Sequence, residues 1–162
     1  MRLSVQFIGL MVCLLMLDSC SSLDGKQTLF FITLHELVPS SEIYDGGMVM
    51  SVQSADGRKR RNVRTVPIIS SAYIHSIEVI PGRDSRHWGL RLYFDEVAKG
   101  LWSEAVHYRK GMQIAVVVDG FLAGFSDLST KRLEEGILEL DDLWNRQEAI
   151  AIARQAQRNH KK

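Results

Sequence analysis

The stretch WGLRLYFDEVAKGLWSEAVHYRKGMQIAVVVDG, residues 88–120, decides the fold predicted for this chain. In its first part, residues 88–94, large apolar side chains alternate with Arg91 and Tyr93. Alternation with a period of two is typical of a strand that buries one face and exposes the other. The first part of the stretch therefore predicts a half-buried strand.

The spacing between apolar residues then lengthens to that of an amphipathic helix, which is predicted over about residues 96–110. The positions predicted to share its buried stripe are Val97, Leu101, Ala105 and Tyr108, flanked by Ala98 and Trp102. Residues 114–118 are apolar at every position, which predicts a strand covered on both faces. Asp119-Gly120 is a dipeptide that favours a tight hairpin turn.

These residues resemble the periplasmic head subdomain of SecD, a subunit of the bacterial protein-export machinery. The resemblance covers roughly residues 68–155. It depends on Asp95, Trp102, Gly111, the run 114–118 closing on Asp119-Gly120, then Gly136, Trp144, Glu148-Ala149 and Ala153. The chain departs from the family pattern at Ala98, Val106, Arg109 and Ser126. The resemblance implies a surface that contacts exported polypeptides, but it implies no catalytic residue.

The expected fold class is α+β, with a mostly antiparallel sheet and helices packed on one face, as in SecD head-like and ferredoxin-like folds. The second helix is expected over residues 146–158, where Asn145 and Glu148 have the spacing of a capping box. The side chains expected in the core are Leu101, Trp102, Ala105, Val116, Val118, Leu140, Ala149 and Ile152.

The first residues predict export to the cell envelope. Met1-Arg2 precedes a short apolar run, as in a secretory signal, and the run is too short to span a bilayer comfortably. Residues 17–20, LDSC, resemble a bacterial lipobox, which implies cleavage after residue 19 and acylation, including palmitate, at Cys20. Cys13 is a competing acylation site, and a signal peptide cut elsewhere or an uncleaved anchor is the alternative.

This interpretation gives three parts: a signal peptide at 1–19, a lipid-anchored tether at 20–27 and one α+β domain at 28–162. The domain would face the periplasm, held by the bilayer through acylated Cys20. Ser21 and Ser22 lack the aspartate associated with inner-membrane retention, which favours the outer membrane.

Two segments, 48–53 and 62–69, flank a turn at 55–58 and predict a hairpin. Its tip and return strand are basic, with Lys59 and the arginines Arg58, Arg60, Arg61 and Arg64. These arginines are candidates for binding anionic headgroups or an acidic partner, or they form a solvated edge that discourages aggregation. The segment 121–127, with Phe121 and Phe125, is a further candidate contact, as is the loop 81–87.

The formal net charge of +1 argues against a general nucleic-acid binder. The sequence contains no metal-ligand spacing, nucleophile elbow, phosphate-binding loop or dinucleotide fingerprint, so no cofactor and no enzyme activity are expected. Three hypotheses follow: a non-catalytic domain that binds exported polypeptides, a structural partner subunit of an envelope complex, or a hydrolase with a site that the sequence does not reveal.

Overall fold

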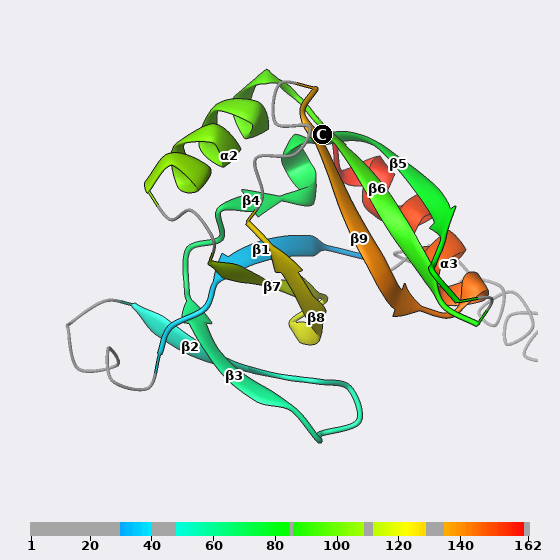
Figure 1. Ribbon diagram of the computed structural model, residues 1–162, viewed down its shortest axis with the longest axis horizontal. Coiled ribbons are helices and arrows are strands. Elements are labelled where there is room, and N and C mark those ends of the chain that lie inside the picture. Colours follow the sequence, from blue (N-terminus) through cyan, green and yellow to red (C-terminus); the bar gives the residue numbers. More distant parts are fainter. Residues whose placement is uncertain (1–29, 40–47, 85, 109–111, 129–134, 161–162) are drawn as a thin grey trace, which may run out of the picture.

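A computed structural model describes residues 30–39, 48–84, 86–108, 112–128 and 135–160 (Figure 1). Its strands are β1 (Ile32–Glu36), β2 (Val49–Gln53), β3 (Arg60–Arg64), β4 (Ile69–Ser70), β5 (Ile74–Pro81), β6 (Trp88–Phe94), β7 (Gln113–Val118), β8 (Phe121–Asp127) and β9 (Ile137–Trp144). Its helices are α2 (Glu96–Tyr108) and α3 (Arg146–Ala156), with short 3-10 turns at Ser71–Tyr73 and Gln157–Asn159. The predicted α+β class is confirmed.

The strands form two sheets. The larger has the order β3-β2-β8-β7-β1-β4, and the smaller has the order β5-β6-β9. Neighbouring strands are antiparallel except β2 and β8, which pair in parallel through Gln53 and Phe121. The mostly antiparallel character is therefore as predicted, while the division into two sheets is a feature that the sequence did not reveal.

β6 lies at the centre of the smaller sheet, and its alternation is as predicted. Leu90, Leu92 and Phe94 are buried on one face. On the other face Arg91 Nη1 lies 2.8 Å from Glu78 Oε2, and Arg91 Nε lies 2.8 Å from Glu139 Oε1. Because one face is apolar and the other carries ion pairs, only the apolar face can take up the rest of the core.

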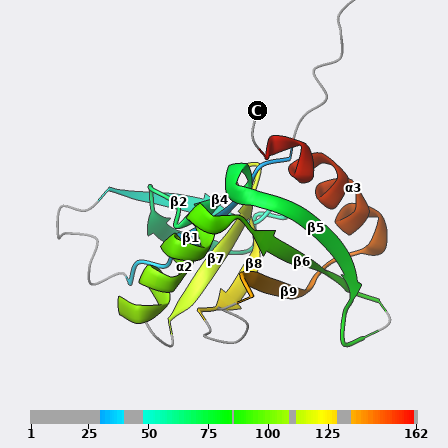
Figure 2. The ribbon, with the colours of Figure 1, turned by 90° about the horizontal axis from the view of Figure 1, so that it is seen from above.

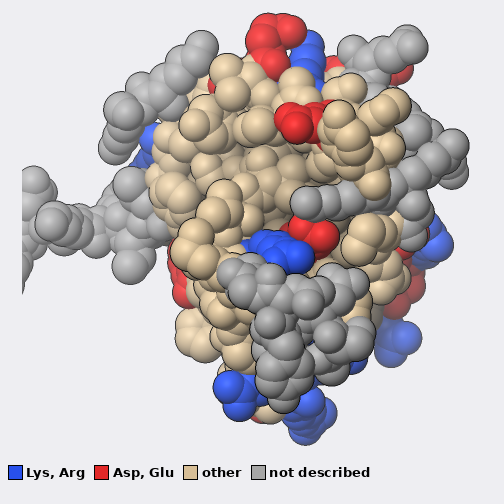
Figure 3. All heavy atoms as spheres, turned by 90° about the vertical axis from the view of Figure 1, so that its left-hand side faces the viewer, with Lys and Arg blue, Asp and Glu red and all other residues tan. Residues whose placement is uncertain are grey.

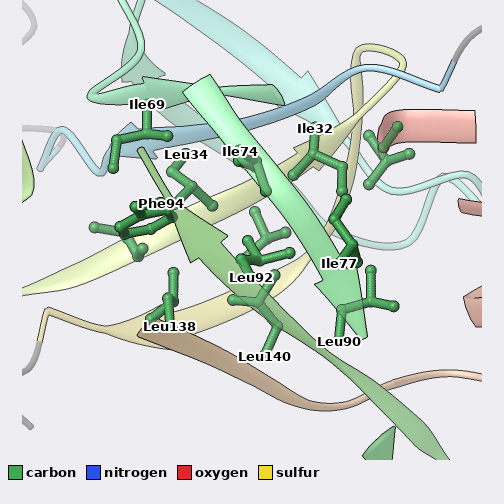
Figure 4. Packing of buried hydrophobic residues seen from close by; sticks show 14 of the residues in the cluster. Ile32, Leu34, Ile69, Ile74, Ile77, Leu90, Leu92, Phe94, Leu138 and Leu140 are labelled. Carbon is green, nitrogen blue, oxygen red and sulfur yellow. The ribbon is translucent and has the colours of Figure 1, made fainter. Parts of the chain in front are cut away.

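The main core fills the space between the two sheets (Figure 4). Side chains of β1 and β4 meet those of β5, β6 and β9 there, and both helices add buried residues to the same cluster. Trp102 of α2 is 2% exposed and tilts against Phe94, with ring centroids 5.7 Å apart. Both helices thus cover the apolar side of the smaller sheet, with α2 and α3 at opposite ends of the molecule in Figure 2.

The larger sheet curls so that its first and fifth strands approach each other. Leu37, just after β1, forms a bridge with Val63 of β3, and the Val38 N–H donates to the Asn62 carbonyl at 2.9 Å. The curled sheet encloses a second cluster made of Val52, Val63, Ala115, Val117 and Leu122. β7 supplies residues to both clusters, which is why all of residues 114–118 are buried, as their composition predicts.

The predicted stripe of α2 is wrong in its orientation. The helix buries Ala98, Trp102 and Val106. Val97, Leu101 and Tyr108 are instead 55%, 39% and 75% exposed, and Ala105 is only partly buried. The buried stripe is spaced by four residues and includes the large Trp102 side chain, so the predicted stripe with Val97, Leu101 and Tyr108 faces outward. The other six residues expected in the core are buried.

Two boundaries also differ from the sequence prediction. The predicted strand 62–69 is divided into β3, which ends at Arg64, and β4, which begins at Ile69. Pro67 lies between them and has no N–H to donate to a strand ladder.

The turn at Asp119-Gly120 is confirmed, with φ of 50° and 84°, and so is the capping box of Asn145 and Glu148.

Candidate functional site

The basic residues of the β2–β3 hairpin point to different partners. The Arg58 side chain is 85% exposed, with Nε 3.6 Å from Asp56 Oδ2. Arg60 donates from Nε to Ser51 Oγ at 2.6 Å, and Arg64 Nε lies 3.8 Å from Glu36 Oε2. The structure therefore spreads these three arginines along the hairpin instead of directing them at one point.

Arg61 and Phe125 are brought together by the curl of the larger sheet. The guanidinium carbon of Arg61 lies 5.9 Å from the centroid of the Phe125 ring, within the range of a cation–π contact. Phe125 also packs against the second apolar cluster. The contact thus links β3 to β8, the strands on either side of β2.

Phe121 is 55% exposed and lines a concave, mainly apolar surface, which we call the α3 groove. Its volume is about 800 Å³. One wall is the β2–β3 turn, the opposite wall is α3, and the floor is the start of β8 with the end of β9. The apolar residues that line it are Phe30, Ala55, Val118, Phe121, Leu122, Ala123, Leu143, Trp144, Ala151 and Ile152.

The floor of the α3 groove is positioned by the turn between β7 and β8. The Phe31 N–H donates to Asp119 Oδ1 at 2.7 Å, and the Asp119 N–H donates to the Phe31 carbonyl at 3.0 Å. Gly124 lies so close to Leu143 that an added Cβ would stand 2.4 Å from its Cδ2. Glycine at this position therefore allows β8 to approach β9 and complete the floor.

The wall formed by α3 is fixed at the start of the helix. Asn145 Oδ1 accepts from the Glu148 N–H at 2.9 Å, and Glu148 Oε2 accepts from the Asn145 N–H at 3.1 Å. Ala149 and Ala153 are buried on the core side of the helix. Ile152 is also buried but lines the groove together with Ala151, so that face of α3 is apolar.

The charged residues that line the α3 groove are Asp56, Lys59, Asp119 and Glu148. The pKa of Asp56 is lowered, first by the hydrogen bond from the Ser54 hydroxyl and then by the Arg58 backbone N–H. This carboxylate is therefore ionised at neutral pH. An apolar floor with three carboxylates and one lysine around it can accept uncharged side chains and attract cations at those carboxylates.

A second concave surface, of about 550 Å³, lies between α2 and the segment joining β3 to β4; we call it the α2 groove. Val66, Leu101 and Tyr108 line it with 65%, 39% and 75% of their surface exposed. Glu36, Arg64 and Glu104 also line it. Figure 3, which faces this side of the molecule, shows a wide uncharged surface with a basic and an acidic group side by side near its middle.

Two histidines lie outside both grooves. His35 is 3% exposed; its Nδ1 is 2.8 Å from the Arg64 carbonyl and its Nε2 is 2.8 Å from Thr33 Oγ1. His160 Nε2 lies 3.6 Å from Asp95 Oδ2, while Asp95 Oδ1 accepts from the Ala98 N–H at the start of α2. Neither His35 nor His160 is among the residues that line the two grooves.

Within the described ranges, no three His, Cys, Asp or Glu side chains are grouped so that they could hold a metal. Neither of the two described helices has the combination of length and apolarity needed to cross a membrane. Cys20, the predicted acylation site, lies outside the described residues.

The architecture defines a class: an α+β domain in which two mostly antiparallel sheets share a core with two helices. Solved structures of SecDF have this fold. One, from work on SecDF as a membrane component that enhances protein export, matches with a TM-score of 0.58 and 13% sequence identity. Another, of SecDF in a super-membrane-facing form, matches with a TM-score of 0.55 and 12% identity. The predicted SecD head-like fold is confirmed by these matches.

The match covers 80% of this chain in both cases, but only 62% of the first SecDF chain and 19% of the second. The likeness is one of fold. No family model matches the sequence, and no curated protein matches it.

Proposed function

We propose that this chain is a non-catalytic domain of the cell envelope that binds segments of exported polypeptides in the α3 groove. The observation that carries the proposal is the groove itself, about 800 Å³ in volume and lined by two phenylalanines, a tryptophan and several aliphatic side chains. Exposed Phe121 gives it an aromatic anchor at the rim. Aromatic residues around a concave apolar surface are typical of sites that bind protein segments.

A polypeptide fits the floor of this groove better than a compact small molecule does. Beyond Phe121, no strand of the described part of the chain pairs with the outer edge of β8. Ala123 and Gly124 on that strand line the groove. An extended segment can pair its main chain with an open strand edge and place alternate side chains in the adjoining apolar surface.

The cellular setting of the proposal comes from the start of the sequence. Acylation at Cys20 would add more than one acyl chain, which is enough for stable attachment to a bilayer. The short tether 20–27 would keep the domain near the membrane surface. SecDF enhances protein export, and a domain of the same fold held in the periplasm is well placed to contact emerging chains.

The alternative is a structural partner subunit of an envelope complex. The α2 groove favours it, because Val66, Leu101 and Tyr108 form an exposed apolar surface that a permanent neighbour would cover. A permanent neighbour would be captured in a fixed ratio, whereas exported segments would be captured as many different chains.

Photo-crosslinking in the native envelope distinguishes the two. A probe replacing Phe121 reports on the α3 groove, and a probe replacing Val97 is a matched control, because both side chains are 55% exposed. The proposal predicts many unrelated exported chains crosslinked at Phe121 and few at Val97. Capture of one stoichiometric protein, or equal capture at both positions, would contradict it.

A further inference from the structure

We propose that the α3 groove selects polypeptide segments in which an apolar core is flanked by Lys or Arg. The inference rests on the proposed function and adds to it the kind of polypeptide segment that the groove would bind. It depends on where charge lies around the groove: three carboxylates and one ammonium line it.

The carboxylates lie on both sides of the apolar floor. Asp56 belongs to the β2–β3 turn, Asp119 to the β7–β8 turn, and Glu148 to the first turn of α3. Lys59 is the one basic residue that lines the groove in the described part of the chain. A segment with a cation at each end of its apolar core would thus meet a carboxylate at either wall, although Lys59 and Arg58 lie on the same wall as Asp56. An acidic end would be repelled by Asp119 and Glu148.

Each carboxylate is held in place by the protein but keeps acceptor capacity. Asp119 Oδ1 accepts from the Phe31 N–H, and Glu148 Oε2 accepts from the Asn145 N–H. Asp56 Oδ1 accepts from the Ser54 hydroxyl and the Arg58 N–H at 2.5 and 3.0 Å. The second oxygens of Asp119 and Glu148 have no hydrogen bond within the described residues. Charges fixed before binding cost less to engage than charges on mobile side chains.

The three acids do not contribute equally. The start of α3 carries a partial positive charge from its unpaired N–H groups, which offsets part of the Glu148 charge. Arg58 lies 3.6 Å from Asp56 Oδ2, although both side chains are largely exposed and the pair is screened by water. Asp119 has neither of these neighbours, so it is the strongest single contributor to the selectivity.

The test uses the full chain in detergent micelles and three synthetic peptides that share one leucine-rich core. Their flanks are Lys, Gln or Glu, and affinity is measured by fluorescence anisotropy at low salt. The comparison protein is the triple variant Asp56→Asn, Asp119→Asn, Glu148→Gln. Asn tolerates the left-handed φ of 50° at position 119, and Gln preserves the capping box, so the variant removes charge without removing these contacts.

We expect the wild type to bind the Lys-flanked peptide about tenfold more tightly than the Glu-flanked one. Each exposed ion pair raises the affinity by less than tenfold, so several pairs together account for this difference. The triple variant should lose this preference and keep its affinity for the Gln-flanked peptide. Binding of the Gln-flanked peptide that Ala151→Trp abolishes would support the proposed function. If the charge of the flanks then has no effect on affinity, the inference fails while the proposed function stands. If none of the peptides binds, both fail.

Discussion

The orientation of α2 can be tested by replacing two valines of the same helix with alanine. Val106 is 3% exposed and belongs to the main core, whereas Val97 is 55% exposed. Val106→Ala removes two buried carbon groups, worth about 0.8 kcal/mol each, and leaves a small cavity besides. We therefore expect it to lower the free energy of unfolding by about 2–3 kcal/mol.

Val97→Ala removes little buried surface and gains the higher helix propensity of alanine, by up to about 0.7 kcal/mol. It should therefore be neutral or slightly stabilising. Urea denaturation followed by circular dichroism measures both, and for a slope of about 1–3 kcal/mol per molar urea the midpoint of Val106→Ala should fall by roughly 1 M or more. Equal losses in the two variants, or a larger loss for Val97→Ala, would refute the orientation of α2 and with it the α2 groove.

Three further changes have defined outcomes. Burial lowers the pKa of His35 below its ordinary 6.5, although the hydrogen bond that the His35 ring donates to the Arg64 carbonyl acts in the opposite direction. The unfolded state therefore binds the proton more readily. The free energy of unfolding should therefore fall as pH drops below 6.5, and His35→Gln should flatten that dependence; an unchanged slope would show that other groups cause it. Asn145→Ala removes the N-cap of α3 and should cost about 1 kcal/mol in urea titration, while no loss would mean that the capping box is dispensable. Cys20→Ser should give a soluble or uncleaved product in membrane fractionation, and a variant that stays with membranes at the same mass would contradict acylation.

Segments whose apolar residues repeat with a single clear period can be predicted from the sequence. Residues 88–94 and 114–118 are strands, and Asp119-Gly120 is a turn, because their burial pattern or backbone angles allow few alternatives. The stripe of α2 was mispredicted because the helix carries apolar residues over more than half of its circumference. Packing in the main core, including the contact of Trp102 with Phe94, decides which part faces inward.

The α3 groove was only partly predictable. The sequence names Phe121 as part of the candidate contact segment 121–127, but Phe30, Leu143 and Trp144 come from distant parts of the chain. Their meeting depends on how β8 approaches β9, where Gly124 leaves room for Leu143. Local periodicity contains no information about such contacts between strands of different sheets.

The most direct measurement of the central claim is hydrogen–deuterium exchange on the full chain with and without an apolar peptide. If exported segments bind in the α3 groove, the peptide should slow exchange in the first half of β8, around Phe121 to Gly124, and at the start of α3. Exchange in α2 should not change. Protection confined to α2, or no protection in β8 at saturating peptide, would contradict the account.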